Sequence, residues 1–274
     1  MFGRKRLTIT TYLLAISIFL LTFTADGSSL RQFVFGWGTD KTSAQQFEVS
    51  SFRNEKRIKE ETAWETAVYV ISSPVEGPTI MVIGGIHGDE PAGYLAADSI
   101  STWAIDRGTL IVLPRANMPA IAERSRSAAG NPDLNRSFPG NHDSDNPTER
   151  LAAHISDIIV EHEPLWVIDL HEALHCERQF PGALGQTFIY PREGSDLDLV
   201  LELLNAVNRT IYSNEQHFLL LRGAAAGSAL ETAQLHGAES IIIETCMQMS
   251  LDERVKYQRQ TVSSLLYLLG ITVY

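Results

Sequence analysis

The chain has 274 residues, of which 44% are hydrophobic and 20% are charged, so it is long enough to bury one large core. This composition excludes a disordered, collagen-like or coiled-coil protein. The formal net charge is −11, which disfavours nucleic acid as a partner. Cys176 and Cys246 are the only cysteines, so no framework of disulfides replaces a hydrophobic core.

The first 27 residues have the pattern of an export segment. Basic residues at positions 4–6 precede a run without charges over residues 7–24. This pattern predicts a secretory signal peptide or an N-terminal membrane anchor, and the length of the run is compatible with both. In either form the protein is expected to be exported, secreted or membrane-anchored with its domain outside the cytoplasm. Residues 28–65 then form an N-terminal extension, and residues 66–274 form the main domain.

Short runs rich in Ile, Val and Leu alternate with longer amphipathic segments from residue 66 onward. This alternation is typical of an α/β domain with a largely parallel sheet. The predicted strands cover residues 67–72, 79–85, 109–115, 165–170, 186–190, 217–221 and 240–245. The predicted helices cover residues 90–104, 147–162, 196–212, 226–236 and 251–269.

The helix predicted over 147–162 has a clear start signal. Asn146 is suited to cap it, Pro147 to occupy its first turn, and Glu149 follows the cap by three residues. Residues 125–146, just before it, hold many turn formers and are predicted to form a long loop. A loop of this length inside a compact domain is usually functional.

The strand over 79–85 leads through a glycine turn into the sequence GGIHGDE. Its imidazole, His87, and its carboxylate, Glu90, are three residues apart and could bind one metal ion. Such a pair is common by chance, so it indicates a metal site only because it lies where a strand meets a turn.

A second predicted strand ends in the sequence VIDLHEALHC. His171 could complete the shell of two histidines and one carboxylate that catalytic zinc favours, and Asp169 could orient a ligand from behind. His175 and Cys176 are the competing ligands. The alternative is a core histidine that is hydrogen-bonded to the backbone. This alternative is less favoured because two predicted strands end in potential metal ligands.

A third strand, ESIIIETC, carries Glu244 after three isoleucines. A buried carboxylate is costly without a partner. Beside an activated water, it could take the proton during attack and pass it to the leaving group. The alternative is a helix cap or a surface glutamate.

The long loop supplies planar donors suited to an anionic substrate. Asn135 and Arg136 match the geometry of a carboxylate, and Arg124 or Arg126 could stabilise an oxyanion. Taken together, the strand ends and this loop indicate a metal-assisted hydrolase of anionic acyl substrates.

Five motifs, GGIHGDE, DLNRSFPG, PTER, DLHE and IIIET, occur in this order. They resemble the aspartoacylase and succinylglutamate desuccinylase branch of the zinc carboxypeptidase superfamily over about residues 66–270. The resemblance implies a three-layer α/β/α fold with a mixed, largely parallel sheet. It implies one Zn²⁺ ion, a general base, a carboxylate clamp, and an upstream arginine on the scissile carbonyl. The positions that match these roles are His87, Glu90 and His171 for zinc, Glu244 for the base, Asn135 and Arg136 for the clamp, and Arg126 for the carbonyl.

The sequence also departs from this family. Cytoplasmic members carry a C-terminal β domain that shapes the acyl pocket, and this chain is expected to lack it because only about 30 residues follow Glu244. The family's further substrate-binding residue is not identified, and Arg222 and Tyr190 are candidates by position. Cys176 and Cys246 each follow a site junction closely, so a disulfide between them would brace the site outside the cytoplasm.

The leading hypothesis is a zinc-dependent hydrolase that cleaves an amide bond in a small anionic acyl amino acid or peptide. Deacylase and carboxypeptidase activities both fit, and an ester hydrolase is an alternative. A hypothesis of another class is a non-catalytic module that binds a peptide terminus on the same fold. A serine or cysteine nucleophile has little support, because the chain has no G-x-S-x-G motif.

Overall fold

The structure is a computed structural model that describes residues 19–23, 30–34, 48–49, 51–59, 62–223 and 226–274. The chain divides into two compact units, Met1–Ser50 and Ser51–Tyr274. In the first unit, three strands form a small antiparallel sheet in chain order. They are β1 (Phe19–Phe23), β2 (Leu30–Val34) and β3 (Glu48–Val49).

The predicted leader falls mostly outside the described residues. Of its apolar run over residues 7–24, only strand β1 belongs to the described part. Across the described ranges, none of the helices is both long and apolar enough to cross a membrane. The export segment therefore stays a prediction from the sequence.

The second unit is built on one sheet of eight strands in the order β10-β9-β11-β8-β6-β7-β5-β4. Strands β11, β8, β6 and β7 are parallel to one another, whereas β9, β5 and β4 each pair antiparallel with a neighbour. The sheet is therefore mixed, and its parallel centre brings the carboxyl ends of β6, β8 and β11 to one edge. The strands are β4 (Phe52–Ile58), β5 (Thr66–Ser72), β6 (Thr79–Gly84), β7 (Thr109–Leu113), β8 (Trp166–Ala173), β9 (Thr187–Tyr190), β10 (Leu219–Arg222) and β11 (Glu239–Cys246).

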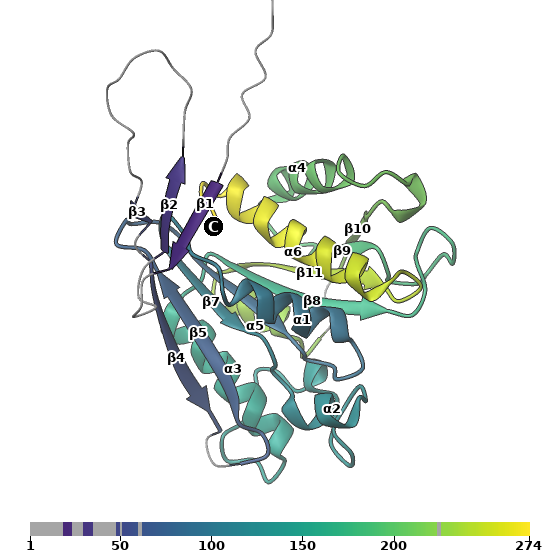
Figure 1. Ribbon diagram of the computed structural model, residues 1–274. Coiled ribbons are helices and arrows are strands. Elements are labelled where there is room, and N and C mark those ends of the chain that lie inside the picture. The colour runs from purple at the N-terminus through teal and green to yellow at the C-terminus, as the bar shows by residue number, and fades with distance from the viewer. Residues whose placement is uncertain (1–18, 24–29, 35–47, 50, 60–61, 224–225) are drawn as a thin grey trace, which may run out of the picture. The chain divides into compact units, whose positions relative to one another are not determined.

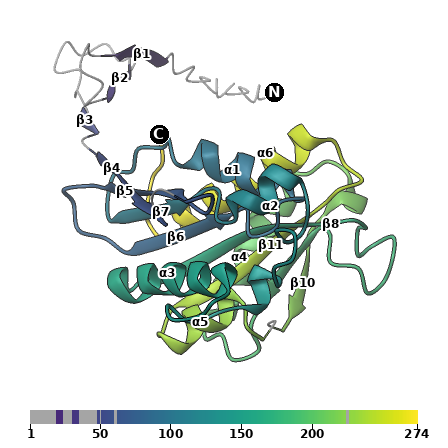
Figure 2. The same ribbon diagram turned by 90° about the horizontal axis from the view of Figure 1, so that it is seen from below.

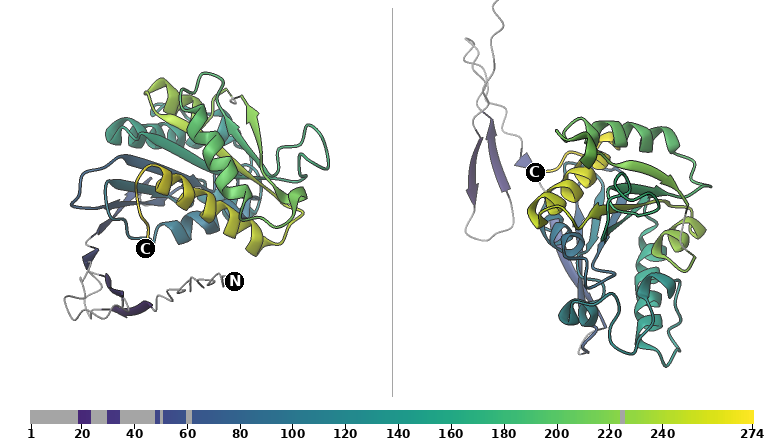
Figure 3. Two further views of the ribbon diagram at one scale, coloured as in Figure 1. Left: turned by 90° about the horizontal axis from the view of Figure 1, so that it is seen from above. Right: turned by 90° about the vertical axis from the view of Figure 1, so that its right-hand side faces the viewer.

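Helices cover both faces of this sheet (Figures 1 and 2). One face packs against α1 (Pro91–Ile100), α4 (Leu197–Asn208) and α6 (Leu251–Leu268), and α4 lies beside α6 there (Figure 3). The other face packs against α3 (Pro147–His162) and α5 (Ala229–Leu235). The unit is thus the predicted three-layer α/β/α domain with a mixed sheet.

Local sequence signals explain where the helices begin. The side chain of Asn146 accepts a hydrogen bond from the Thr148 amide at 2.8 Å, and Pro147 opens α3 as predicted. Helix α6 begins with a capping box, in which Ser250 and Glu253 satisfy each other's backbone amides. These caps fix the two longest helices at the ends nearest the predicted site loop and the end of β11.

The seven strands and five helices predicted from residue 66 onward are confirmed, with small shifts at their ends. Strand β4 and the short helix α2 (Met118–Glu123) are among the elements that were missed. The compact unit includes β4, which lies within the range 28–65 that was assigned to an extension. Strand β4 is mostly exposed and charged, so its sequence gives little of the alternation that marks a half-buried strand.

Candidate active site

The site begins where strand β6 turns into helix α1. Gly85 adopts a left-handed φ of 71°, and a Cβ on Gly88 would lie 2.0 Å from the Ala120 backbone, so neither position accepts a side chain without rearrangement. This tight turn places His87 and Glu90 at the carboxyl end of β6, with both side chains buried.

His171 on β8 joins these two residues in one buried cluster. The Nδ1 atom of His87 lies 2.6 Å from one oxygen of Glu90, and Nδ1 of His171 lies 2.8 Å from the other. The two Nδ1 atoms are 3.2 Å apart. Three ligand atoms of the types that zinc binds therefore converge on one point.

The outer nitrogen of each histidine faces an aspartate. Nε2 of His87 lies 3.1 Å from Asp133 Oδ1, and Nε2 of His171 lies 2.9 Å from Asp169 Oδ2. Metal-ligating histidines usually have a carboxylate or carbonyl behind them, which fixes the ring so that the inner nitrogen faces the metal. The three converging ligand atoms and the two aspartates behind the histidines thus both fit a site for one divalent cation.

The charges inside the cluster are strongly coupled. Burial alone would raise the pKa of Glu90, but His171 and His87 outweigh it and lower this pKa to about 2. Burial likewise opposes a charge on His171, yet Asp169 and Glu90 raise its pKa well above the usual range. Without a metal, the cluster therefore favours an ionised Glu90 together with protonated imidazole. A bound cation would supply the positive charge in place of that proton.

Glu244 lies on β11 directly beside His171 on β8 in the parallel register. Its side chain is buried, and its Oε2 atom has no hydrogen-bond partner. Burial, countered only in part by His171, raises its pKa to about 8. Neither a helix cap nor a surface glutamate describes this residue, and its unpaired oxygen is free to bind a proton.

Arg126 lies next to the cluster, and Arg124 does not. The Nη1 atom of Arg126 is 3.4 Å from His87 Nδ1 and 3.8 Å from Glu90 Oε1. Asp133 positions the guanidinium through Nε at 3.1 Å and Nη2 at 2.8 Å. Arg124 is exposed and ends helix α2 in a left-handed conformation.

Asn135 and Arg136 lie on the short helix η1 (Leu134–Arg136) in the predicted long loop. Asn135 is buried with its Oδ1 unpaired, and Arg136 is exposed with Nη1 donating to the Asn135 carbonyl at 2.6 Å. Both residues line a cavity of about 450 Å³ together with the histidine cluster, Arg126 and Glu244. All seven predicted site residues therefore share one cavity.

The other candidates lie elsewhere. His175 is exposed and contacts Gln248 and the ring of Phe180. Tyr190 is buried and donates to Glu239 at the beginning of β11, at the opposite end of that strand from the site. Arg222 stacks on the Tyr190 ring, so neither of these residues reaches the cavity in this structure.

Two residues behind the site gave no clear signal in the sequence. Asp133 contacts both His87 and Arg126, and only its place two residues before Asn135 hinted at a role. Arg254 on α6 forms a buried ion pair with Glu172. The backbone amide of Glu172 in turn donates to Glu90 at 3.0 Å, which links helix α6 to the histidine cluster.

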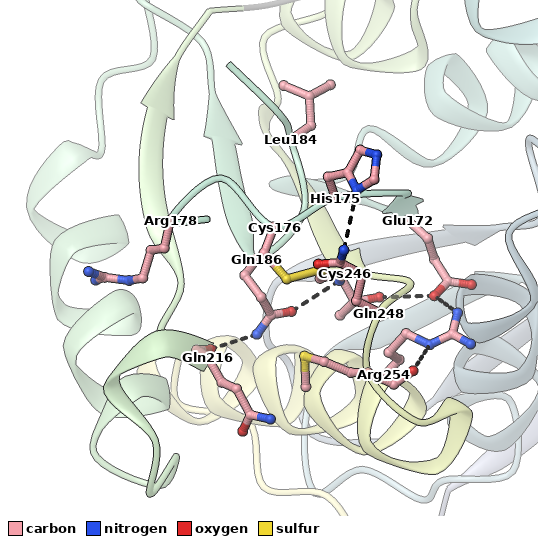
Figure 4. Close-up of a disulfide and its surroundings, with 12 residues drawn as sticks. Glu172, His175, Cys176, Arg178, Leu184, Gln186, Gln216, Cys246, Gln248 and Arg254 are labelled. Atoms are coloured by element: carbon pink, nitrogen blue, oxygen red, sulfur yellow. Dashed lines mark hydrogen bonds and ion pairs between the residues drawn. A yellow bond between two sulfur atoms is a disulfide. The ribbon is translucent and has the colours of Figure 1, made fainter. Parts of the chain in front are cut away.

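Cys176 and Cys246 form a disulfide between the loop after β8 and the end of β11 (Figure 4). Gln186 reinforces this connection, because its Oε1 accepts from the Cys246 amide at 3.2 Å and its Nε2 donates to the Gln216 carbonyl at 2.7 Å. The disulfide expected between these two cysteines is confirmed.

Residues 76–269 match the succinylglutamate desuccinylase/aspartoacylase catalytic domain. The chain is 36% identical to N-alpha-acetyl-L-2,4-diaminobutyric acid deacetylase of Halomonas elongata over 118 residues, which is 41% of this chain and 34% of that protein. The fold resembles that of the cell shape determinant protein Csd4 of Helicobacter pylori, with a TM-score of 0.67 at 21% identity over 72% of this chain and 52% of Csd4.

A second solved structure with this fold is succinylglutamate desuccinylase/aspartoacylase of Rhodobacter sphaeroides. Its TM-score is 0.60 at 20% identity, over 80% of this chain and 66% of that chain. The chain thus spans about a third of the curated relative and about half of Csd4.

Proposed function

The chain belongs to the succinylglutamate desuccinylase/aspartoacylase catalytic domain family, and on this premise we propose that it is a zinc-dependent hydrolase of an amide bond in a small carboxylate-bearing substrate. One observation carries the proposal. The buried cluster of His87, Glu90 and His171 shares a cavity with Glu244, whose carboxylate has an unpaired oxygen.

His87, Glu90 and His171 would hold the zinc ion, and Asp133 and Asp169 would keep the two rings in place. When bound, zinc would lower the pKa of a water molecule to about 7 and polarise the scissile carbonyl. Zinc is favoured over harder cations because two of the three ligands are imidazoles.

Glu244 acts as general base and then as general acid. It takes a proton from the attacking water as the new carbon–oxygen bond forms, and it gives that proton to the leaving nitrogen as the amide bond breaks. Arg126 stabilises the negative charge that develops on the carbonyl oxygen. Asn135 and Arg136 hold the substrate carboxylate and so fix the amide bond near Glu244.

Two kinds of substrate fit this machinery. An N-acyl amino acid is supported by the family and by the deacetylase relative, whose name specifies an acetylated diaminobutyric acid. A peptide with a free carboxyl end is supported by the likeness of fold to Csd4, which is described as a D,L-carboxypeptidase. Ester hydrolysis would use the same groups, and a non-catalytic binding module would not require the unpaired Glu244.

The test is hydrolysis by the zinc-loaded full chain, with N-acetylamino acids and free-carboxyl peptides as parallel substrates. The Glu244→Gln variant should keep one zinc ion and lose turnover by about 10²–10⁴-fold. Glu202→Gln is the matched control, because Glu202 is an exposed glutamate on α4, and this variant should change neither the zinc content nor the turnover. Full turnover in the Glu244→Gln variant would contradict the mechanism, and bound zinc without hydrolysis of either class would favour the binding module.

We also propose that the domain works outside the cytoplasm. The apolar run over residues 7–24 and the disulfide between Cys176 and Cys246 support this location. Fusion of residues 1–27 to a reporter enzyme that is active only after export would test it. An inactive reporter in a bacterial host, with the fusion protein present in the cytoplasm, would contradict the proposal.

A further inference from the structure

One wall of the active-site cavity is apolar. The histidine cluster, Asp89 and the two arginines supply its polar side, whereas the remaining wall is formed from three segments of chain. These segments are the loop after β8, strand β9 and the end of β11. Their lining residues are Leu174, Leu184, Ile189, Ile242 and Met247.

The apolar wall begins next to Glu244. Ile242 precedes Glu244 by two residues on β11, so both side chains project from the same face of the sheet. Ile189 on β9 pairs directly with Ile242 in the antiparallel register. The two isoleucines therefore form a continuous apolar floor that extends from Glu244 along β11 and onto β9, which lies on the opposite side of β11 from β8 and the zinc ligand His171.

The position of Glu244 decides which part of the substrate contacts this floor. A general acid must lie within hydrogen-bond reach of the leaving nitrogen. The amino acid that carries this nitrogen is therefore on the Glu244 side of the bond, while the scissile carbonyl lies toward His87 and Arg126. Ile242 and Ile189 then face the side chain of the released amino acid, and the acyl group lies on the other side.

The rim of the wall is held in place before any substrate binds. Leu174 is 64% exposed and Leu184 is 43% exposed, and both belong to the loop that the disulfide ties to β11. Figure 4 shows Leu184 on this loop together with the disulfide. Gly185 pairs with Cys176, and its amide donates to the His175 carbonyl at 3.0 Å. A rigid rim with exposed leucines gains from covering by an apolar group.

A charged substrate side chain would find no partner on this wall. Among the described lining residues other than the zinc ligands, the positively charged ones are Arg126 and Arg136, and these are needed for the carbonyl and the carboxylate. The acidic lining residues lie among or next to the zinc ligands, apart from Glu244 itself. An ammonium or carboxylate placed over Ile189 would therefore lose hydration without compensation.

From these contacts we infer that the cavity contains an apolar side-chain subsite, and that the protein prefers substrates that release an amino acid with an aliphatic side chain. The inference rests on the proposed function, because it uses Glu244 as the proton donor to the leaving nitrogen. It differs from the substrate named for the deacetylase relative, whose diaminobutyric acid carries a side-chain amine.

The experiment measures kcat/KM of the zinc-loaded full chain for a series of N-acetylamino acids. The series contains the derivatives of leucine, methionine, alanine, aspartate, glutamate and diaminobutyrate. Burial of one methylene changes kcat/KM by about fourfold, so full burial of three extra carbons would favour leucine over alanine by about 60-fold. Since the rim is open, a preference of at least about tenfold is expected. Equal or faster hydrolysis of the aspartate, glutamate or diaminobutyrate derivative would overturn the inference and leave the proposed function intact.

Two variants locate the effect. Ile189→Thr and Leu184→Ser should each reduce the preference for leucine over alanine by about fourfold, with the zinc content unchanged. Leu201→Ser on α4 replaces a leucine of similar exposure, 40%, and serves as the matched control. An unchanged preference in both wall variants would overturn the assignment of this wall.

A binding measurement separates failure of the inference from failure of the proposed function. Calorimetric titration of the zinc-loaded chain with free L-leucine and free L-aspartate needs no turnover. If no N-acetylamino acid is hydrolysed, the deacylase proposal fails, and tighter binding of leucine still supports the subsite. Equal or tighter binding of aspartate would overturn the subsite as well.

Discussion

Replacement of Arg254 by methionine should destabilise the protein strongly, because it would leave Glu172 as an unpaired buried carboxylate. Glu172 is 4% exposed, and its Oε1 contacts the Arg254 guanidinium while its Oε2 accepts from the Ala92 amide at 2.6 Å. Removal of one partner from a buried ion pair costs about 3–5 kcal/mol. This is a large part of the 5–15 kcal/mol that is typical for the stability of a domain.

Urea unfolding of the metal-free protein, followed by circular dichroism, would measure this cost. The double variant Arg254→Met with Glu172→Gln should recover most of the loss, since a neutral amide replaces the buried charge. Arg259→Met is the matched control, because Arg259 lies exposed on the same helix, and its effect should stay within about 0.5 kcal/mol. The reasoning would be refuted if Arg254→Met lay within about 1 kcal/mol of the native protein, or if the double variant were no more stable than the single one.

Three further predictions follow from the same contacts. His171→Ala should abolish binding of zinc, measured by metal analysis of the purified protein, whereas His175→Ala should retain one ion; zinc loss only in the latter would reassign the third ligand. Serine at both Cys176 and Cys246 should cost about 4 kcal/mol in unfolding free energy, because the disulfide closes a separation of 70 residues, and should leave the zinc content unchanged. The pKa of Glu253 is lowered by hydrogen bonds from its capping partner, so its contribution to stability is present above about pH 4.5 and is lost as the pH falls through the lower folded value. The unfolding free energies of the native protein and Glu253→Gln should therefore differ by less than about 1 kcal/mol near pH 7 and converge near pH 3; a difference that grows on acidification would contradict this sign.

The sequence was sufficient for the parallel core of the sheet and for the seven polar and charged residues predicted for the site, all of which line the cavity. Strands β6, β8 and β11 are buried apolar runs that end in polar groups, so their type and the edge at which they meet follow from the pattern alone. His171 could not be separated from His175 by spacing. In the structure, His171 is the last strand residue but two and faces the cavity, whereas His175 lies beyond the strand end and is exposed.

Contacts between distant segments were not predictable from the pattern. Arg254 follows Glu172 by 82 residues, and nothing in an amphipathic helix marks which of its arginines will be buried. Asp133 appears in the sequence as an ordinary turn residue, and only the folded loop brings it to His87 and Arg126. The apolar wall likewise depends on the pairing of β9 with β11, which local periodicity does not specify.

Strand β8 shows why the site tolerates so little change in register. Asp169 and His171 project from one face of the sheet, whereas the alternate residues Leu170 and Glu172 project from the other, toward helices α1 and α6. Gln258 on α6 also donates to the His171 carbonyl at 2.9 Å, so the segment of β8 that carries His171 is also attached to the helix behind it. A shift of one residue would turn His171 toward the helices on the other face and separate Glu172 from Arg254. The ion pair between Glu172 and Arg254 therefore helps to keep His171 oriented toward Glu90 on the other face of the strand.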